Sequence, residues 1–145
     1  MANKFSSSFS RIWAVLLLGV SLSCGYESSL EVNLQSGAPP QFTLSGGKAL
    51  GSFFVYRIPE GLADEPVPTD KMTKESPDMM WLIEGRRSEE GPITYGAVPK
   101  GMQEVIPAKP LQEGEHYLVF GTSLSQGGFK GLRFVINDGN AVRTQ

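Results

Sequence analysis

The chain of 145 residues contains a single cysteine, Cys24, and a single histidine, His116. Nucleophilic catalysis by a serine or cysteine needs a base beside the nucleophile, so such a site would have to use His116. His116 directly precedes Tyr117 at the start of a predicted strand, and strand alternation turns these two side chains to opposite faces. No Gly-x-Ser-x-Gly motif accompanies the histidine. We therefore interpret His116 as a solvated strand residue and predict no catalytic residue.

Acidic residues gather in two predicted loops, at residues 60–65 and at Glu89 and Glu90. Their spacing is not that of an EF-hand, so solvated loop charge is favoured over calcium binding. A zinc site built from several His or Cys ligands is excluded by the count of those residues. Two carboxylates that converge in space could still form a hydrolase site, because their spacing is set in three dimensions.

Methionine could ligate a soft metal, and the chain carries Met72, Met102 and the pair Met79 and Met80. The pair stands beside Trp81 in an apolar run, where methionine fills gaps in a core. We favour the core interpretation. The sequence therefore predicts no metal site and no cofactor.

Cys24 follows a segment with the order of a secretory signal peptide. Lys4 and Arg11 give the N-terminus a positive charge, an apolar run covers residues 12–20, and small residues lead up to the cysteine. A membrane-spanning helix needs about 20 apolar residues. This run is shorter and is interrupted by serine, so it predicts a signal peptide and not a membrane span.

The residues Ser-Leu-Ser-Cys at 21–24 resemble the lipobox of bacterial lipoproteins. The resemblance implies cleavage between Ser23 and Cys24, a diacylglyceryl group on the Cys24 thiol, and a further acyl chain such as palmitate on the new amino terminus. Ser21 departs from the leucine most often found at its position. Gly25, in place of an aspartate, implies the outer membrane over the inner one.

Lipidation would also explain the lone cysteine, which has no partner for an internal disulfide. Several acyl chains anchor a protein durably, whereas one chain binds a membrane only marginally. The alternative is a leader cut by ordinary signal peptidase, which would leave Cys24 as a thiol. We expect a lipid-anchored protein of the bacterial cell envelope whose membrane partner is lipid.

These boundaries divide the chain into a signal peptide at 1–23, a lipidated cysteine and tether at 24–29, and a domain at 30–145. Removing the leader takes away Lys4 and Arg11 and no acid, so the formal charge moves from −2 to −4. This mild acidic excess argues against a nucleic-acid partner. The 122 residues from 24 to 145 suit one domain with its own core.

Short runs of aromatic and β-branched residues, separated by Gly and Pro, predict strands joined by turns. The expected strands are 30–34, 41–45, 51–58, 79–85, 93–97, 102–107, 116–123 and 129–137. The runs at 52–58 and 79–85 are apolar on both faces, so a loop or a second layer should cover their outer side. We expect a hairpin connection between Glu84 and Ile93, and a tight turn or strand end at Asp138-Gly139. The segment 59–78 is expected to be a long loop.

The stretch at 110–122 resembles the tyrosine corner of immunoglobulin-like and fibronectin type III domains, with Leu111, Gly114 and then Tyr117. The resemblance implies that the Tyr117 hydroxyl returns to the backbone a few residues upstream, and that Trp81 packs in the core. The fold predicted is thus an all-β, immunoglobulin-like β-sandwich of about seven to eight strands.

Such domains act through loops and sheet edges, so the first functional hypothesis is a noncatalytic binding or assembly module for an envelope protein or glycan. Two alternatives stay open. One is a small carboxylate-dependent hydrolase. The other is a carbohydrate-binding module, which would expose aromatic residues. Its nearest candidates are Phe53, Phe54, Tyr56 and Tyr95, although core packing is the default interpretation for all four.

Overall fold

The structure, a computed structural model, describes residues 31–46, 49–87, 90–124 and 131–145. This part of the chain forms antiparallel strands and one short 3-10 helix, η1 (Thr69–Lys71). The strands are β1 (Glu31–Gln35), β2 (Gln41–Ser45), β3 (Leu50–Arg57), β4 (Met79–Gly85), β5 (Ile93–Thr94), β6 (Met102–Ile106), β7 (His116–Ser123), β8 (Leu132–Asn137) and β9 (Asn140–Arg143). None of these residues belongs to a helix long and apolar enough to cross a membrane.

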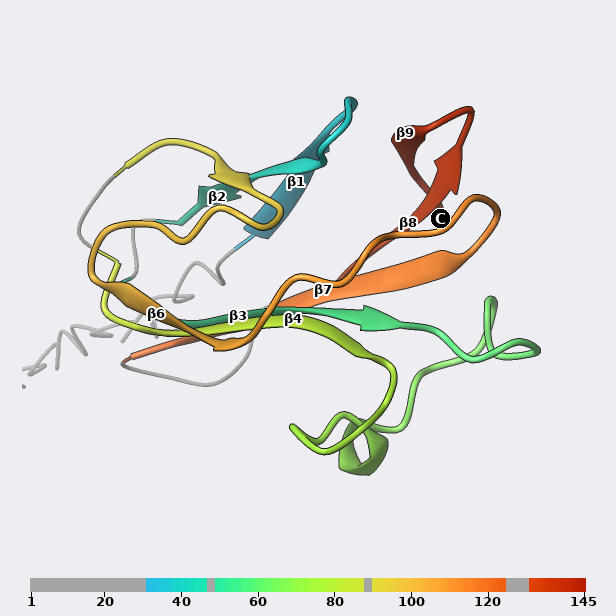
Figure 1. Cartoon of the computed structure of the whole chain (residues 1–145), viewed down its shortest axis with the longest axis horizontal. Coiled ribbons are helices and arrows are strands. Elements are labelled where there is room, and N and C mark those ends of the chain that lie inside the picture. Colours follow the sequence, from blue (N-terminus) through green and yellow to red (C-terminus); the bar gives the residue numbers. More distant parts are fainter. Residues whose placement is uncertain (1–30, 47–48, 88–89, 125–130) are drawn as a thin grey trace, which may run out of the picture.

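The strands form two layers, a small sheet of order β1-β2-β5 and a large sheet of order β6-β4-β3-β7-β8-β9 (Figure 1). The all-β sandwich prediction is confirmed. The run β4-β3-β7-β8 repeats the C′-C-F-G order of immunoglobulin variable domains, and β1-β2-β5 repeats A-B-E. Strand β6 departs from that scheme, because it lies between β5 and β7 in the chain but pairs with β4 at the sheet edge.

The core between the sheets is aromatic. Phe42 of the small sheet contacts Phe53 and Phe134 of the large sheet, at ring-centroid distances of 5.5 and 5.7 Å. Trp81 meets Phe53 edge-on at 5.9 Å and is fully buried, as the sequence predicts. Its indole N–H donates to the Glu104 carboxylate over 3.0 Å. Trp81 lies on β4, one strand away from the C position that the conserved tryptophan of antibody domains occupies.

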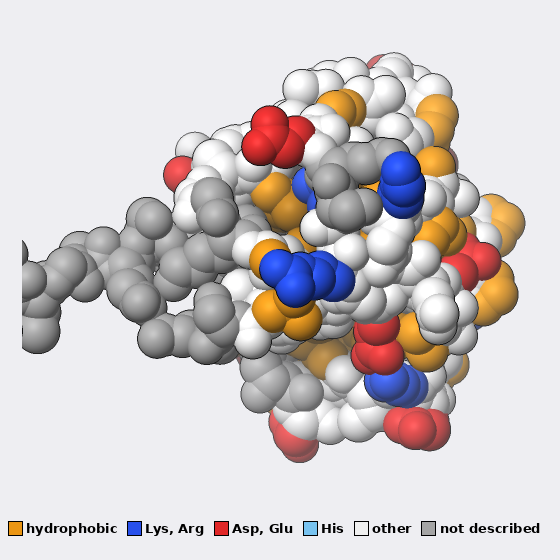
Figure 2. Space-filling view, turned by 90° about the vertical axis from the view of Figure 1, so that its left-hand side faces the viewer, with side chains coloured by type: hydrophobic (Ala, Val, Ile, Leu, Met, Phe, Trp, Pro, Cys, Tyr) orange, Lys and Arg blue, Asp and Glu red, His pale blue; other side chains and the backbone are white. Residues whose placement is uncertain are grey.

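Strand register defines two ends of the sandwich. Glu31 pairs with Ser45 in the small sheet, and Gly85 pairs with Met102 in the large sheet, at what we call the Glu31 end. The turn after β1 lies at the opposite end, together with the β8–β9 turn, whose Ala141 N–H reaches the Gly37 carbonyl over 3.4 Å. Figure 2 views the molecule from the left of Figure 1, where the Glu31 end lies, and shows basic and acidic side chains on the same face.

The outer face of the large sheet carries a second apolar cluster of Tyr56, Met79 and Leu82. The segment 58–78, which we call the strap, covers it by packing Val67 and Met72 against these side chains. The strap contains η1 and hangs below the large sheet in Figure 1. The sequence-based expectation of a covered second face is confirmed, and the long loop proves to be this cover.

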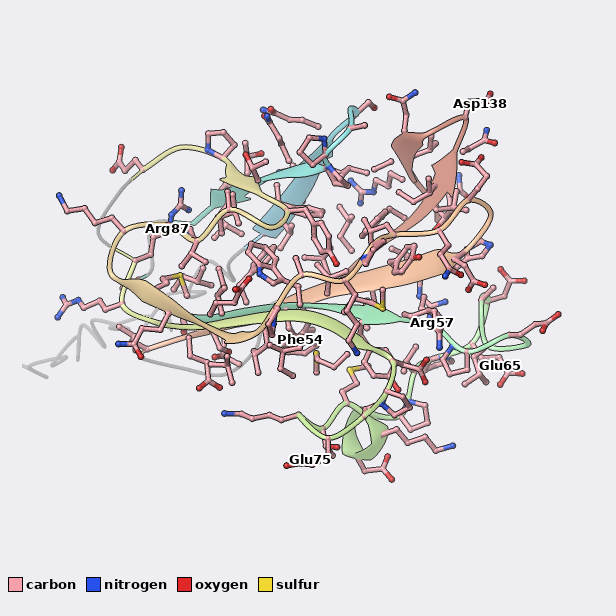
Figure 3. All side chains as sticks on the ribbon, in the orientation of Figure 1. Phe54, Arg57, Glu65, Glu75, Arg87 and Asp138 are labelled. Carbon is pink, nitrogen blue, oxygen red and sulfur yellow. The ribbon has the colours of Figure 1, made fainter. Side chains whose placement is uncertain are left out.

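Polar contacts hold the strap at its base, near η1 and at its far bend. At its base, the guanidinium of Arg57 (labelled in Figure 3) donates to the Asp78 carboxylate over 2.6 and 2.9 Å, and this bond raises the pKa of Arg57. Near η1, the Tyr56 hydroxyl lies 3.5 Å from the Lys71 carbonyl. At the far bend, the Arg133 guanidinium on β8 donates to the carbonyls of Leu62, Ala63 and Glu65.

We predict that Arg133→Ala frees the bend of the strap, because one guanidinium satisfies three carbonyls there. Amide hydrogen exchange in residues 59–66 should accelerate about tenfold, which corresponds to a local loss of about 1–2 kcal/mol. Arg133→Lys should restore little of the protection from exchange, since an ammonium lacks the planar fork of donors that a guanidinium has. Arg143→Ala on the neighbouring strand is the control. Unchanged exchange in Arg133→Ala would show that apolar packing alone holds the strap.

Several sequence expectations need correction. The strand expected at 93–97 ends at Thr94, because Ala97 N–H turns back to the Thr94 carbonyl and Gly96 has φ +79°. The hairpin expected between Glu84 and Ile93 is wrong, since β4 and β5 lie in different sheets and do not pair with each other. Leu30 and Phe129, which were expected to begin strands, lie outside the described residues.

Strand β9 is missing from the prediction, so the count of about seven to eight strands falls short of the nine in the part described. Asp138 and Gly139 form a two-residue turn with φ of +50° and +74°, and Asn137 pairs with Asn140 across it. Positive φ at both central residues belongs to a type I′ turn, which favours Asp-Gly. The expected turn is therefore a hairpin that adds β9.

Candidate functional site

An open groove of about 500 Å³ lies at the end of the sandwich opposite the Glu31 end, which we call the groove end. Four connections or strand ends build it, namely the β1–β2 turn, the residue after β5, the β6–β7 connection and the β8–β9 hairpin. Its lining residues are Ala38, Pro39, Pro40, Tyr95, Pro110, Leu111, Glu113, Ile136 and Gly139. The volume falls in the range of small-ligand and peptide-anchor sites, about 300–1,000 Å³.

Glu113 ties two walls of the groove together. Its carboxylate accepts the N–H of Asp138 over 2.6 Å and the N–H of Gly139 over 3.1 Å. Gly114 N–H adds a 2.9 Å bond to the Ile136 carbonyl. The β6–β7 connection is thereby joined to the β8–β9 hairpin by side-chain and backbone bonds, so the groove is preformed on this side.

Tyr95 joins the other walls. Its backbone N–H donates to the Pro40 carbonyl over 2.9 Å, and its hydroxyl lies 2.7 Å from the Lys109 carbonyl. The ring also packs edge-on against Trp81 at 5.4 Å. Tyr95 therefore links the β1–β2 turn and the β6–β7 connection to the core.

Tyr117 lies beneath the groove. Its hydroxyl accepts the N–H of Gln112 over 2.8 Å, five residues upstream, which is the contact of a tyrosine corner. Its ring stacks on Phe134 with centroids 5.2 Å apart. This contact orients the connection that carries Leu111 and Glu113, so the tyrosine corner positions one wall of the groove.

Burial raises the pKa of Tyr95 well above its ordinary value, and burial also raises the pKa of Tyr117. A raised pKa in the folded state means that the folded protein holds the phenol proton more tightly than the unfolded chain does. The stabilisation is complete below the unfolded pKa of about 10 and is lost as the pH rises beyond it.

We therefore predict that the free energy of unfolding falls above pH 10, and that Tyr95→Phe removes part of this fall. Between pH 9 and pH 11 the wild type should lose about 1 kcal/mol more than the variant. Urea unfolding followed by circular dichroism at a series of pH values measures the difference. Parallel curves for the two proteins would contradict the prediction.

A second hollow of about 380 Å³ lies beside the strap and contains His116. Glu60 from the strap and Glu115 from the turn before β7 line it with the histidine. The sequence placed His116 on a solvated strand face, and the structure finds it partly exposed on that strand, opposite Val135. No sequence motif links these three residues, because they meet only through the path of the strap.

The residues singled out from the sequence do not lie together. Ser23 and Cys24 fall outside the described residues. Trp81 and Tyr117 are core residues close to the groove. Of the aromatic candidates for a glycan platform, Phe53 and Tyr56 are buried, so core packing, the default interpretation, is confirmed for both.

Among the candidate metal ligands, Met80 and Met102 belong to the main core and Met79 to the outer cluster, so the core interpretation of these methionines is confirmed. In residues 31–46, 49–87, 90–124 and 131–145, no group of three or more His, Cys, Asp or Glu could hold a metal ion.

Most groove residues carried no sequence signal of function. In the sequence, Pro39-Pro40 and Lys109-Pro110 indicate only turns or loops between strands, and nothing distinguishes Glu113 from the other acidic residues. The strand pairings bring these segments together from positions as far apart as 38 and 139.

No known protein family, curated protein or solved structure matches the chain.

Proposed function

We propose that this protein is a lipid-anchored, noncatalytic binding module of the bacterial cell envelope, which binds its partner in the groove. The observation that carries the proposal is the position of the groove. It lies at the β1–β2 turn, whereas Glu31 begins β1 at the opposite end of the sandwich. A tether that reaches the domain through Glu31 would leave the groove facing away from the membrane.

The tether is short in this proposal. Five residues separate Cys24 from Leu30, and five extended residues span at most about 17 Å. The Glu31 end would then rest close to the lipid surface. A binding site at that end would be obstructed by headgroups, whereas the groove end stays accessible to another envelope component.

The chemistry of the groove supports binding over catalysis. Its walls are mostly proline, leucine and isoleucine side chains. The Glu113 carboxylate in the groove accepts hydrogen bonds from two backbone N–H groups. This arrangement suits a structural role and not proton transfer. Apolar walls with a few fixed polar groups are typical of recognition sites.

The anchoring half of the proposal is tested by the intact mass of the protein from the membrane fraction. The expected mass is that of residues 24–145 plus acyl groups, with loss of acylation and of membrane association in Cys24→Ala. Ser123→Ala, a substitution at the end of β7, controls for handling of the protein. An unmodified, soluble wild-type product would overturn the lipoprotein assignment and leave the groove to be judged separately.

A further inference from the structure

The groove has few free hydrogen-bond donors to offer a ligand. Its prolines, Pro39, Pro40 and Pro110, carry no N–H, and the Pro40 carbonyl already accepts the N–H of Tyr95. The N–H groups of Asp138 and Gly139 are already bound to the Glu113 carboxylate. The Tyr95 hydroxyl lies 2.7 Å from the Lys109 carbonyl, to which it donates. A ligand that fits these walls should therefore bring its own donors.

The rim is acidic. Glu113 lines the groove, Asp138 stands at the tip of the adjoining hairpin (Figure 3), and Glu60 and Glu115 line the neighbouring hollow. The carboxylates of Glu113, Asp138 and Glu60 form no ion pair with a cation in the described part of the chain. This edge of the molecule thus presents negative charge that the domain does not neutralise itself.

The nearby cations are held elsewhere. Arg57 is paired with Asp78, and Arg133 donates to the carbonyls of the strap. Lys109 directs its ammonium to the Pro77 carbonyl at 3.1 Å. Arg57 also attracts Glu115 of the neighbouring hollow, but none of these three cations forms an ion pair with Glu113 or Asp138.

We infer that the groove binds an extended peptide segment in which apolar residues stand beside Lys or Arg. The apolar side chains pack between Leu111, Ile136 and the proline rings, while peptide N–H groups donate to the carbonyls of Pro39 and Pro110. The basic side chains reach Glu113 and Asp138 at the rim. This inference rests on the proposed binding function and names its partner.

Other ligand classes fit less well. A glycan needs an exposed aromatic platform, but the Tyr95 ring packs edge-on against Trp81. An anionic headgroup or a nucleic acid would be repelled by Glu113 and Asp138. A fatty acyl chain alone would use the apolar walls and leave the acidic rim without a role.

The test measures fluorescence anisotropy of labelled peptides with the full-length protein in detergent. The probes are Leu-Pro-Leu-Lys-Leu-Arg, the same peptide with Glu at both basic positions, and a version with Gln there. We expect the basic peptide to bind about tenfold more tightly than the acidic one at low salt, with the difference shrinking at high salt. Equal binding, or preference for the acidic peptide, would overturn the inference.

Two pairs of variants locate the site. Ala38→Trp fills the groove from an exposed position and should abolish binding, whereas Ala49→Trp, also exposed but at the Glu31 end, should not. Asp138→Asn removes a rim charge while asparagine still suits the φ of +50°, and it should weaken binding about threefold. Glu75→Gln on the strap should leave binding unchanged.

The possible results separate this inference from the proposed function. Groove-dependent binding of a fluorescent fatty acid or an oligosaccharide, without binding of the basic peptide, would overturn the peptide inference and keep a binding module. Peptide binding that survives Ala38→Trp would place the site elsewhere and overturn it as well. The intact-mass measurement decides anchoring independently of all these results.

Discussion

Trp81→Ala should lower the free energy of unfolding by about 3–5 kcal/mol, the range for removing a large buried aromatic side chain. Trp81 is fully buried and contacts the rings of Phe53 and Tyr95. The substitution leaves a cavity between the sheets and also removes the N–H that binds Glu104. Urea unfolding followed by far-UV circular dichroism measures the loss.

Two variants interpret that result. Trp81→Phe keeps most of the apolar volume and loses the bond to Glu104, so it should cost about 1–2 kcal/mol. Val142→Ala, at a position 43% exposed on β9, should change stability by less than about 0.5 kcal/mol. A loss below about 1.5 kcal/mol in Trp81→Ala would mean that the core around this side chain is not closely packed.

Gly85→Ala should cost about 2–4 kcal/mol, because strain and overlap add at this position. Gly85 has φ +140°, and a Cβ atom there would lie 2.5 Å from the Gly101 carbonyl oxygen and 3.0 Å from the Met102 Cα. Both neighbours are backbone atoms, so no rotamer change relieves the overlap. The pairing of β4 with β6 should loosen, which amide exchange in β6 would detect.

The variant Gly91→Ala measures how much of the expected loss of stability comes from the backbone conformation alone. Gly91 has φ +114°, but no atom lies within 4 Å of an added Cβ. It should therefore cost only about 1 kcal/mol, the lower range for a strained φ. Equal losses in the two variants would show that the overlap at Gly85 is relieved by a backbone shift.

Local patterns were sufficient to predict most strands. Alternation in residues 132–137 buries Leu132, Phe134 and Ile136 as expected, and β2, β4 and β7 have the predicted bounds. Partner choice was not predictable in the same way. The sequence between Glu84 and Ile93 has the pattern of a hairpin connection, yet β4 and β5 lie in different sheets, because pairing depends on how distant strands fill the core.

The site was less predictable than the fold. The tyrosine-corner contact of Tyr117 followed from a short motif with a fixed offset to its backbone partner. The groove depends on Ala38, Tyr95 and Ile136 meeting across two sheets, and no spacing within one segment encodes that. Strand β9 was not predicted from the sequence because Asn140–Arg143 is short and mixed in polarity.

The strap and the groove are expected to have separate roles, the strap in stability and the groove in binding. The strap covers apolar surface on the outer face of the large sheet, so that face is closed over Tyr56 and Leu82. The groove leaves its apolar walls open at the end of the sandwich. Loosening the strap through Arg133 should therefore affect stability and leave peptide binding in place.

The pairing of β3 has a consequence for how the chain reaches its fold. β3 lies between β4 and β7, and its register with β7 joins Arg57 to Tyr117 and Leu50 to Ser123. Contacts between such distant positions give a high contact order, for which folding takes milliseconds to seconds and not microseconds. The central sheet cannot close until residues 116–123 are available, so the domain completes its fold only after most of the chain has been synthesised.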